Sequence, residues 1–397
     1  MRKKLYIYLI FYFFILIFLA SSLSISPKEA LIVYDSRSML HCIVNFIINI
    51  FGANNISLRL FFIMTNIANI LLFFNIATKS LKKENDVLLA TIIFSLLPGF
   101  ISSSLVVNEA PLVIFFTLLF LYFYIKFNKK AYLLFPIMLL IDNSFAIFFL
   151  ALFFYSLYKR DNLTMVLSLL FFTISMYIFG FDVGGKPKNY FLDTFAIYSA
   201  IFSPLLFIYF FYTLYRILIK GEKDIVWFIS FVAFIFSLLL SFRQRISFED
   251  FAPFVLIGII FMVKEFFASY RVRVFEFRKR HRVGFFIVIS ILLLNNFLLI
   301  FNKPLYYLID NPKKHFAYNF HLSNELANRL KSLNILCVDA KNRKLQYQLK
   351  FYGIKKCNKY ILSDEKMWPT SKKVSICYNN IILKEYYVSK INSKNCF

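Results

Sequence analysis

The chain has 397 residues, of which 60% are hydrophobic and 20% aromatic, and its formal net charge is +25. A soluble domain is only about 45–50% apolar, so this chain carries more apolar surface than a water-soluble fold of its length buries. A soluble enzyme, a disordered scaffold and a low-complexity protein are therefore excluded. The positive charges form short clusters between long apolar runs, which is typical of a polytopic membrane protein and not of a nucleic-acid-binding protein.

Membrane-spanning helices are predicted wherever about 17–25 mostly apolar residues follow one another. Candidate spans cover residues 5–22, 57–77, 87–106, 111–127, 162–181, 197–218, 225–242, 251–268 and 284–301. The first span resembles a signal peptide, but Ser21 to Ser24 offer no clear small-x-small cleavage site, so we expect an uncleaved helix. The segment 131–158 is also apolar but is interrupted at Asp142, which we expect to cap the helix that follows.

The distribution of Lys and Arg decides how residues 131–158 cross the membrane. If they form two short helices, the N-terminus and the five loops on its side hold 21 Lys and Arg, and the loops opposite hold 7. If they form one long helix, the later loops exchange sides and this excess disappears. We therefore predict about eleven crossings, with residues 1–301 as an all-α transmembrane domain. The N-terminus is then cytoplasmic, and the C-terminal part of the chain lies outside.

From residue 302 the composition changes to that of a small folded domain. Short apolar runs predict strands at 334–338, 360–362 and 374–378. Between the first two, residues 343–352 predict a helix that ends before Gly353, for which we expect a left-handed conformation. We therefore predict that residues 302–397 form a periplasmic α/β domain.

Four of the five cysteines lie in this C-terminal segment. We expect Cys337 to be a core strand residue without a disulfide; one disulfide among Cys357, Cys377 and Cys396, or none, are equal alternatives. The spacing of the four does not resemble a zinc site. No Gly-rich phosphate loop, Gly-x-Ser-x-Gly elbow or His-Glu-x-x-His sequence occurs, so these soluble-enzyme chemistries have no support.

Acidic side chains on the predicted outer face are candidates for function, because a charge beside the membrane is costly unless it is paired or hydrated. Asp35 lies in the first outer loop, just before an amphipathic stretch from Met39 to Phe51. Glu109 lies in a turn so short that it must sit at the membrane boundary. The structural alternative for both is to cap the N-terminus of a helix.

Cationic outer residues are candidates for binding a phosphate, since guanidinium and ammonium groups pair with phosphate oxygens. These candidates are Arg59, Arg243, Arg245, Lys186 and Lys188, with Arg37 and His41 as further site candidates. Each has a structural alternative. Arg59 extends to the interface from its span, the later arginines pair with Glu249 and Asp250, the lysines belong to a solvated loop, and the histidine makes an interfacial hydrogen bond.

Several of these landmarks occur together in one known superfamily. Asp35 is followed by Phe51-Gly52 and Leu58-Arg59-Leu60, Glu109 stands between the third and fourth spans, and Arg243-Gln244-Arg245 precedes Phe251-Ala252-Pro253. In these features residues 1–301 resemble the GT-C superfamily of polyprenyl-phosphate-dependent glycosyltransferases, which includes protein mannosyltransferases and aminoarabinose transferases.

The resemblance implies an integral membrane glycosyltransferase that transfers a sugar from a polyprenyl-phosphate donor to a periplasmic glycan, lipid or protein. It implies that Asp35 is the catalytic base and that Glu109 orients the acceptor. A role for a divalent metal ion is left open; Asp35 and Glu109 are the candidate ligands. The Asn-, Lys- and Phe-rich composition indicates a bacterial inner membrane, where the other partners are membrane lipids.

Two other classes of function remain open at this point. One is a transporter or flippase for a lipid or a small solute, although the chain shows no internal repeat and has only 9 Gly for broken, gated helices. The other is a non-catalytic assembly factor whose working part is the C-terminal domain.

Overall fold

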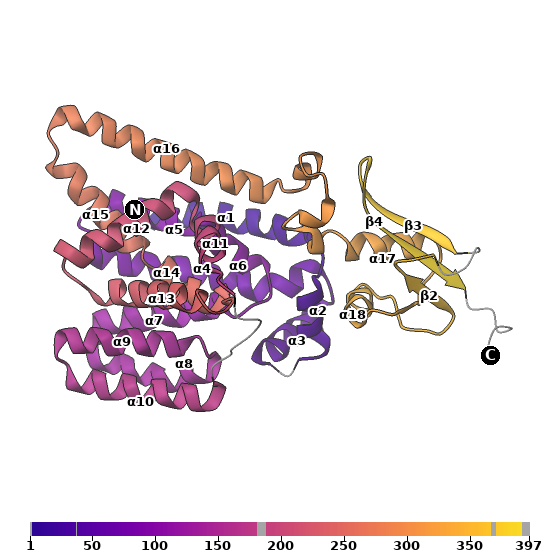
Figure 1. The fold of residues 1–397 in the computed structure, drawn as a ribbon, viewed down its shortest axis with the longest axis horizontal. Helices are drawn as coiled ribbons and strands as arrows, with labels where there is room; N and C mark the ends of the chain where they lie inside the picture. The colour runs from indigo at the N-terminus through magenta and orange to yellow at the C-terminus, as the bar shows by residue number, and fades with distance from the viewer. Residues whose placement is uncertain (1, 37, 181–187, 367–370, 391–397) are drawn as a thin grey trace. The chain divides into compact units, whose positions relative to one another are not determined.

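The structure is a computed structural model that describes residues 2–36, 38–180, 188–366 and 371–390. The chain divides into two compact units (Figure 1). The first unit comprises Met1–Phe13 and Phe62–Phe297, and the second comprises Phe14–Phe61 and Leu298–Phe397.

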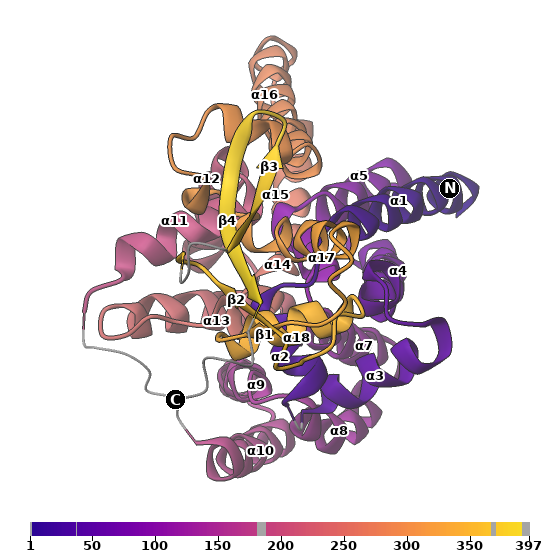
Figure 2. The same ribbon diagram turned by 90° about the vertical axis from the view of Figure 1, so that its right-hand side faces the viewer.

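The first unit is a bundle of apolar helices. It contains α5 (Glu84–Ser95), α6 (Pro98–Leu105), α7 (Ala110–Phe127), η1 (Asn128–Leu134), α8 (Phe135–Ile141), α9 (Phe145–Lys159), α10 (Asn162–Phe179), α11 (Phe191–Phe202), α12 (Pro204–Lys220), α13 (Ile225–Ser241), α14 (Phe248–Leu256) and α15 (Ile259–Val272), with parts of α1 (Arg2–Ser22), α4 (Asn55–Ser80) and α16 (Phe275–Ile300). Among them α9 and α10 lie side by side (Figures 1 and 2).

Most predicted spans are helices in the structure. In the described part of the chain, six helical segments are long and apolar enough to cross a membrane, and nine are if each bent pair of helices counts as one. The six correspond to predicted spans. The two halves of segment 131–158 are separate helices as predicted, and like α13 they are shorter than a full crossing. The protein is therefore a polytopic membrane protein with an all-α membrane part, and the number of eleven crossings stays a prediction.

Two predicted spans are wrong in shape because each is a pair of helices with a sharp bend. The span 87–106 is α5 and α6, bent by 53°, and the span 197–218 is α11 and α12, bent by 107°. Pro98 and Pro204 begin the second helix of each pair, because proline has no N–H to continue the helical ladder. At the sharper bend, Ser203 has a φ of +87°.

A neighbouring helix compensates for the break between α5 and α6. The side-chain amide of Asn296, on α16, donates to the carbonyl of Leu96 at 2.6 Å. Asn66 on α4 donates in the same way to the carbonyl of Phe100 at 2.9 Å. A broken helix is tolerated in a membrane where such groups satisfy the freed backbone. The Asn296 amide does so at the break, and the Asn66 amide binds α6 to α4 beyond it.

The turn between α8 and α9 is held by aromatic packing. The fully buried ring of Phe135 lies 5.5 Å from the ring of Phe120 and 5.1 Å from that of Phe149, centre to centre. Asp142 ends α8, and its carboxylate accepts backbone hydrogen bonds from Asn143 and Ser144, which is the capping contact predicted for it. The residue directly before α9, Ser144, makes no capping bond with its own side chain. The Ser144 hydroxyl donates to the Asp142 carboxylate at 2.5 Å.

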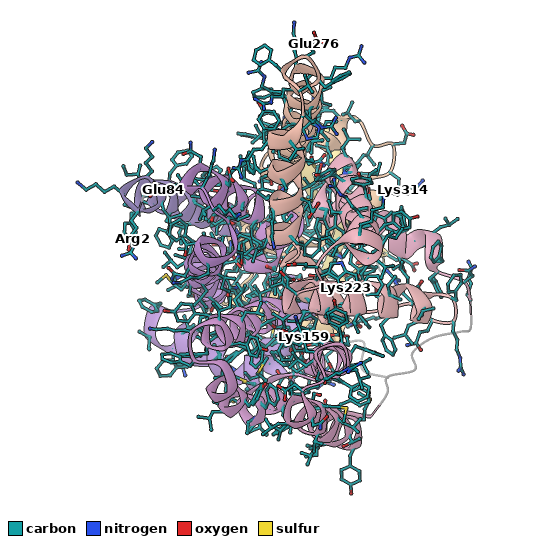
Figure 3. The ribbon with its side chains drawn as sticks, turned by 90° about the vertical axis from the view of Figure 1, so that its left-hand side faces the viewer. Arg2, Glu84, Lys159, Lys223, Glu276 and Lys314 are labelled. Atoms are coloured by element: carbon teal, nitrogen blue, oxygen red, sulfur yellow. A yellow bond between two sulfur atoms is a disulfide. The ribbon has the colours of Figure 1, made fainter. Side chains whose placement is uncertain are left out.

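The loops predicted to be cytoplasmic meet at one end of the first unit. Figure 3 views the unit from the end at which α9 finishes and α13 and α16 begin. Charged side chains on this end include Arg2, Glu84, Lys159, Lys223 and Glu276. Helices that alternate in direction between two membrane faces require such an arrangement.

The second unit combines the first outer loop with a small sheet. It contains α2 (Pro27–Tyr34), α3 (Met39–Phe51), η2 (Lys303–Tyr307), η3 (Pro312–Lys314), η4 (Tyr318–Phe320), α17 (Ser323–Ser332), β1 (Asp339–Ala340), α18 (Arg343–Phe351), β2 (Tyr360–Ser363), β3 (Lys372–Tyr378) and β4 (Ile381–Lys390). The sheet order is β1-β2-β4-β3 (Figure 2). Strands β1 and β2 are parallel, and the other pairs are antiparallel.

The prediction of a small C-terminal α/β fold is confirmed. The predicted helix is α18, and Gly353 after it has a φ of +85° as expected. The strands predicted at 360–362 and 374–378 are β2 and β3. The first strand is shorter than predicted, since regular pairing covers only β1. Strand β4, the longest of the sheet, and α17 were not predicted.

The prediction that Cys337 has no disulfide is wrong, because Cys337 is bonded to Cys357 with their Cα atoms 5.5 Å apart. After α18 the chain runs parallel to the segment that precedes β1, and a parallel β-bridge pairs Cys337 with Lys355. This return brings the two cysteines together. Cys377 is a free thiol, and Cys396 lies outside the described residues.

A buried histidine in the second unit gives a pH dependence of stability. The hydroxyl of Tyr306 lies 2.9 Å from Nδ1 of His321. Burial, together with the nearby charges of Lys303 and His315, lowers the pKa of His321 to about 4. Because the unfolded chain binds this proton at a higher pH than the folded protein does, stability is complete above the unfolded pKa of 6.5 and is lost as the pH falls towards 4.

We expect the folded state to lose about 3 kcal/mol between pH 6.5 and pH 4 through this one group. The variant His321→Gln keeps a hydrogen-bond acceptor for Tyr306 but cannot titrate. Thermal unfolding of the full-length protein in detergent, measured at several pH values, should therefore show a weaker pH dependence for the variant. If the unfolding temperature falls equally with pH in both proteins, His321 does not cause the pH dependence of stability.

Candidate active site

A buried ion pair holds the first outer loop of the second unit. Arg59 lies in the second turn of α4 and Glu29 in the first turn of α2, and both side chains are fully buried. The guanidinium Nη2 lies 3.2 Å from Oε2 of Glu29. The same carboxylate accepts from the N–H of Ser26 at 2.8 Å, which completes a capping box at the start of α2.

The guanidinium of Arg59 also binds the backbone where α1 ends. It donates to the carbonyl of Leu23 at 2.8 Å and to that of Ser24 at 3.0 Å. The alternative that Arg59 extends to the interface is wrong, because its side chain is fully buried. Its predicted role in binding phosphate does not fit this environment either, since the group is enclosed and paired inside the protein. We therefore leave Arg59 out of the proposed phosphate site.

The chain between α1 and α2 is fastened to the C-terminal segment. Ile25 donates its N–H to the Tyr352 hydroxyl at 2.9 Å, and its carbonyl accepts from Gln348 at 2.7 Å and from Ser323 at 2.8 Å. The Tyr352 hydroxyl donates to Asn55 at 2.7 Å. The boundary predicted at residue 302 thus separates two segments that pack within one unit.

Asp35 is the residue that ends α2, in the first outer loop. Its N–H donates to the carbonyl of Leu31 at 2.8 Å, so it closes α2 and does not cap the start of a helix. Its carboxylate Oδ1 is 2.5 Å from Nη2 of Arg343, the first residue of α18. The side chains of Asp35 and Arg343 are 35% and 67% exposed. Asp35 is therefore a solvent-accessible carboxylate on a rigidly held loop.

The helix after Asp35 is the predicted amphipathic stretch. α3 begins after Ser38 and buries Leu40 and Val44, while Phe46 and Phe51 are exposed, as in a helix that lies in the membrane interface. Nδ1 of His41 lies 2.9 Å from the carbonyl oxygen of Ile32. Nδ1 is the donor of this hydrogen bond, because a carbonyl oxygen can only accept. This contact joins α3 to α2. The candidate Arg37 lies outside the described residues.

Glu109 stands in the turn between α6 and α7 of the first unit. Its carbonyl accepts from the N–H groups of Leu112 and Val113 at 2.9 and 3.0 Å, which starts α7. The side chain of the preceding Asn108 accepts from the N–H of Ala110 at 3.0 Å. Glu109 is partly exposed. The turn therefore presents an acidic residue at the end of two helices, as predicted.

A cavity of about 220 Å³ lies next to this turn. Ser102 and Ser103 of α6, Asn108 of the turn and Glu249 of α14 form its polar lining. Hydroxyl, amide and carboxylate groups of this kind bind a ligand that carries hydroxyls. The cavity is the candidate place for a sugar or for the acceptor group in the first unit.

A second, smaller cavity of about 100 Å³ includes Arg245 and Asp250. Both Arg243 and Arg245 are exposed, and within the described ranges neither makes a side-chain hydrogen bond or ion pair. The alternative that they pair with Glu249 and Asp250 is therefore not observed. Their guanidinium groups remain available to a ligand.

The candidate Lys188 lies beside Arg243. Its N–H donates to the Arg243 carbonyl at 3.2 Å, and Tyr190 donates to Ser241 at 2.8 Å, so the chain before α11 runs along the end of α13. The lysine side chain is exposed. Lys186 lies outside the described residues. The structure thus brings three of the predicted cations, Lys188, Arg243 and Arg245, to the same end of α13.

Asp142 is a further acidic group, for which the sequence favours a helix cap and leaves a site-lining role as the alternative. It lies in the turn between α8 and α9, where burial raises its pKa and the nearby carboxylate of Glu249 raises it further. Perturbed carboxyl groups of this kind gather at functional sites. The signal in the sequence was the polar break in an otherwise apolar run.

In the described part of the chain, no three His, Cys, Asp or Glu side chains lie close enough together to bind a metal ion. The proposed ligands Asp35 and Glu109 belong to different units. We derive no chemical step through a metal ion.

Comparisons with known proteins find a family that matches part of the sequence and a solved structure with a similar fold. The profile of the family "dolichyl-phosphate-mannose-protein mannosyltransferase" matches residues 43–141. The chain is similar in structure to ArnT from Cupriavidus metallidurans, crystallised in the apo state, with a TM-score of 0.54, 10% identity and 98% of each chain covered. No curated protein matches the sequence.

The two matches support each other. The family match begins inside α3 and ends with α8, so it includes the turn that carries Glu109. The fold match covers almost the whole chain and shows a shared architecture. Both matches agree with the GT-C resemblance inferred from the sequence: one is a family of membrane glycosyltransferases that matches residues 43–141, and the other is a fold shared over nearly the whole chain.

Proposed function

We propose that this protein transfers a sugar from a polyprenyl-phosphate donor to a periplasmic glycan, lipid or protein. The observation that carries the proposal is the group of cations at the end of α13, whose side chains have no protein partner in the described chain. Arg245 lines one cavity with Asp250, and the neighbouring residue Glu249 lines the cavity that contains Asn108. The matching family is named for a sugar carried on a lipid phosphate, which is the chemistry that such cations suit.

The reaction breaks the bond between the anomeric carbon and the lipid phosphate oxygen. An acceptor hydroxyl or amine attacks that carbon, its proton passes to a carboxylate, and the lipid phosphate leaves with the bonding electrons. Asp35 is the proposed base, because it is accessible and its loop is held by the Arg59–Glu29 pair. Glu109 is proposed to orient the acceptor.

Charge grows on the leaving phosphate as the bond breaks, and fixed cations stabilise it. Arg243 and Arg245 are the proposed ligands, with Lys188 and Lys186 as further contacts to the head group. A guanidinium binds two phosphate oxygens at once. Their exposure lets the head group enter from the membrane interface.

We place the protein in a bacterial inner membrane, with a cytoplasmic N-terminus and the C-terminal segment in the periplasm. Two observations support this orientation. The Cys337–Cys357 disulfide suits an oxidising compartment. The end of the first unit that carries Arg2 and Lys159 (Figure 3) would face the cytoplasm, as positive charges favour.

Arg245→Gln is expected to lower the rate of sugar transfer by about 100-fold, because the variant keeps a polar side chain but loses the charge that faces the phosphate. Arg282→Gln, the same change at the other end of the bundle, is the matched control and should leave the rate unchanged. The measurement is transfer by purified variants in vesicles. Equal rates for Arg245→Gln and the natural protein would remove Arg245 from the site.

The proposed function is tested with isolated membranes, which supply the acceptor. Synthetic polyprenyl phosphates that carry different labelled sugars are added, and both the label in acceptor material and the released polyprenyl phosphate are measured. We expect equal amounts of both products for one sugar. Movement of label across sealed vesicles without a covalent product would instead identify a transporter.

A further inference from the structure

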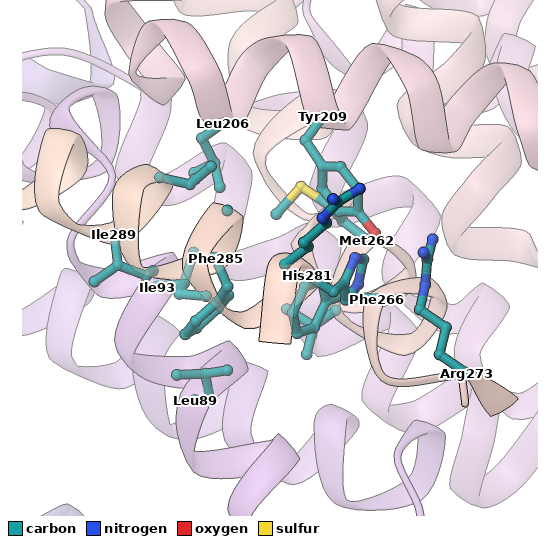
Figure 4. Close-up of a pocket in the computed structure, with 14 residues that line it drawn as sticks. Leu89, Ile93, Leu206, Tyr209, Met262, Phe266, Arg273, His281, Phe285 and Ile289 are labelled. Atoms are coloured by element: carbon teal, nitrogen blue, oxygen red, sulfur yellow. The ribbon is translucent and has the colours of Figure 1, made fainter. Parts of the chain in front are cut away.

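A cavity in the first unit lies apart from the cations at the end of α13. It has a volume of about 460 Å³ and is lined by α5, α12, α15 and α16 (Figure 4). Its walls are almost entirely apolar, with Leu89, Ile93, Leu206, Phe285 and Ile289 among them. Such walls suit a hydrocarbon chain.

Two arginines and a histidine lie at one end of this cavity. Arg273 and His281 line it together with Tyr209 (Figure 4). Arg280 is a further lining residue. The His281 ring stacks on Phe266 with ring centres 4.7 Å apart. Its Nε2 atom is buried and has no hydrogen-bond partner among the described residues. This end therefore offers positive charge and an unsatisfied polar atom to a ligand.

Two acidic residues near this end are paired with arginines, and a third, Glu276, lies in the first turn of α16. Asp86 forms an ion pair with Arg271, and Glu265 lies 3.3 Å from Arg216. In the described chain, neither Arg273 nor Arg280 has a side-chain partner. The net charge facing the cavity is thus positive and calls for an anionic ligand.

The position of the cavity separates it from the donor site. Its cationic end lies near the junction of α15 and α16, at the end of the bundle seen in Figure 3, which also carries Lys223 before α13. Arg243 and Arg245 follow the opposite end of α13, a helix of 17 residues and about 25 Å in length. A lipid in this cavity would have its head group in the other leaflet.

We propose that this cavity binds an anionic phospholipid of that leaflet. One acyl chain lies along Leu89, Ile93 and Ile289, and the phosphate lies against Arg273 and Arg280. Basic pockets between transmembrane helices on the cytoplasmic side are recognised sites for anionic head groups. The bound lipid would join α16, which is mostly exposed to the surrounding lipid, to the rest of the bundle.

Gly284 offers a way to fill the cavity without disturbing the fold. It lines the cavity on α16, and a Cβ atom added there would meet nothing within 4 Å. Gly284→Leu therefore places a side chain in the space for the acyl chain. Val283→Leu adds a methylene at the adjacent exposed position outside the cavity and is its matched control.

The test is native mass spectrometry of the full-length protein with phosphatidylglycerol, phosphatidylethanolamine or polyprenyl phosphate. We expect one phosphatidylglycerol to be retained in preference to phosphatidylethanolamine. Arg273→Gln and Arg280→Gln should each weaken retention about fivefold, and Gly284→Leu should abolish it. Arg282→Gln and Val283→Leu should behave as the natural protein.

Three results would overturn the proposal. The first is equal retention of the anionic and the zwitterionic phospholipid. The second is unchanged retention in the Arg273, Arg280 and Gly284 variants. The third is selective retention of polyprenyl phosphate at the same residues, which would make the cavity a site for the carrier lipid.

Discussion

Asp35→Asn is expected to lower the rate of sugar transfer by about 100- to 10,000-fold. The variant keeps the shape and hydrogen-bonding capacity of the side chain but cannot take a proton from the acceptor. Its fold should be intact, because Asp35 is partly exposed and the loop is held by the buried Arg59–Glu29 pair. The measurement is single-turnover transfer in vesicles, together with thermal unfolding of the same preparation.

The matched control is Arg343→Gln, because Arg343 is the partner of Asp35 in the ion pair. If Asp35 only fastens α18 to the first outer loop, the two variants must have the same effect. If Asp35 is the base, Asp35→Asn is far more harmful than Arg343→Gln. Equal rates for the two variants would show that the carboxylate has a structural role alone.

The second large effect concerns stability. Arg59→Met is expected to reduce the free energy of unfolding by about 3–5 kcal/mol. The change leaves the carboxylate of Glu29 buried without its partner, and the carbonyls of Leu23 and Ser24 lose a donor. The midpoint of thermal unfolding in detergent measures the loss.

The double variant Arg59→Met/Glu29→Leu distinguishes this account from a role in substrate binding. Replacing both partners of a buried pair by apolar residues is often close to neutral, so the double variant should recover much of the lost stability. A stable Arg59→Met protein with weakened donor binding would point to the opposite conclusion, that the guanidinium serves the lipid phosphate.

The long helices could be predicted because a bilayer demands uninterrupted apolar runs. The shape of α11 and α12 could not, since apolar composition is the same for a straight span and for one broken at Ser203 and Pro204. In the C-terminal segment, the end of α18 could be predicted from Gly353, which follows the helix. β4 was missed, because its Lys384 and Glu385 interrupt the alternation that marks a strand.

Some features of the candidate site could also be predicted from the sequence, and others could not. The turn with Glu109 and the cations after α13 were visible as charges placed where charges are costly. The sequence could not show that Arg59 points inward, because a residue near the start of a span reaches either the interface or the core. Nor could it show that Cys337 meets Cys357, which depends on the return of the chain after α18.

The most direct test of the central claim is the pool of lipid-linked sugars in cells. Mass spectrometry of lipid extracts should show that one polyprenyl-phosphate-linked sugar accumulates in cells that lack the protein. The natural gene should restore the normal level, and the Asp35→Asn gene should not. An identical pool in all three strains would contradict the assignment of a polyprenyl-phosphate sugar as the donor.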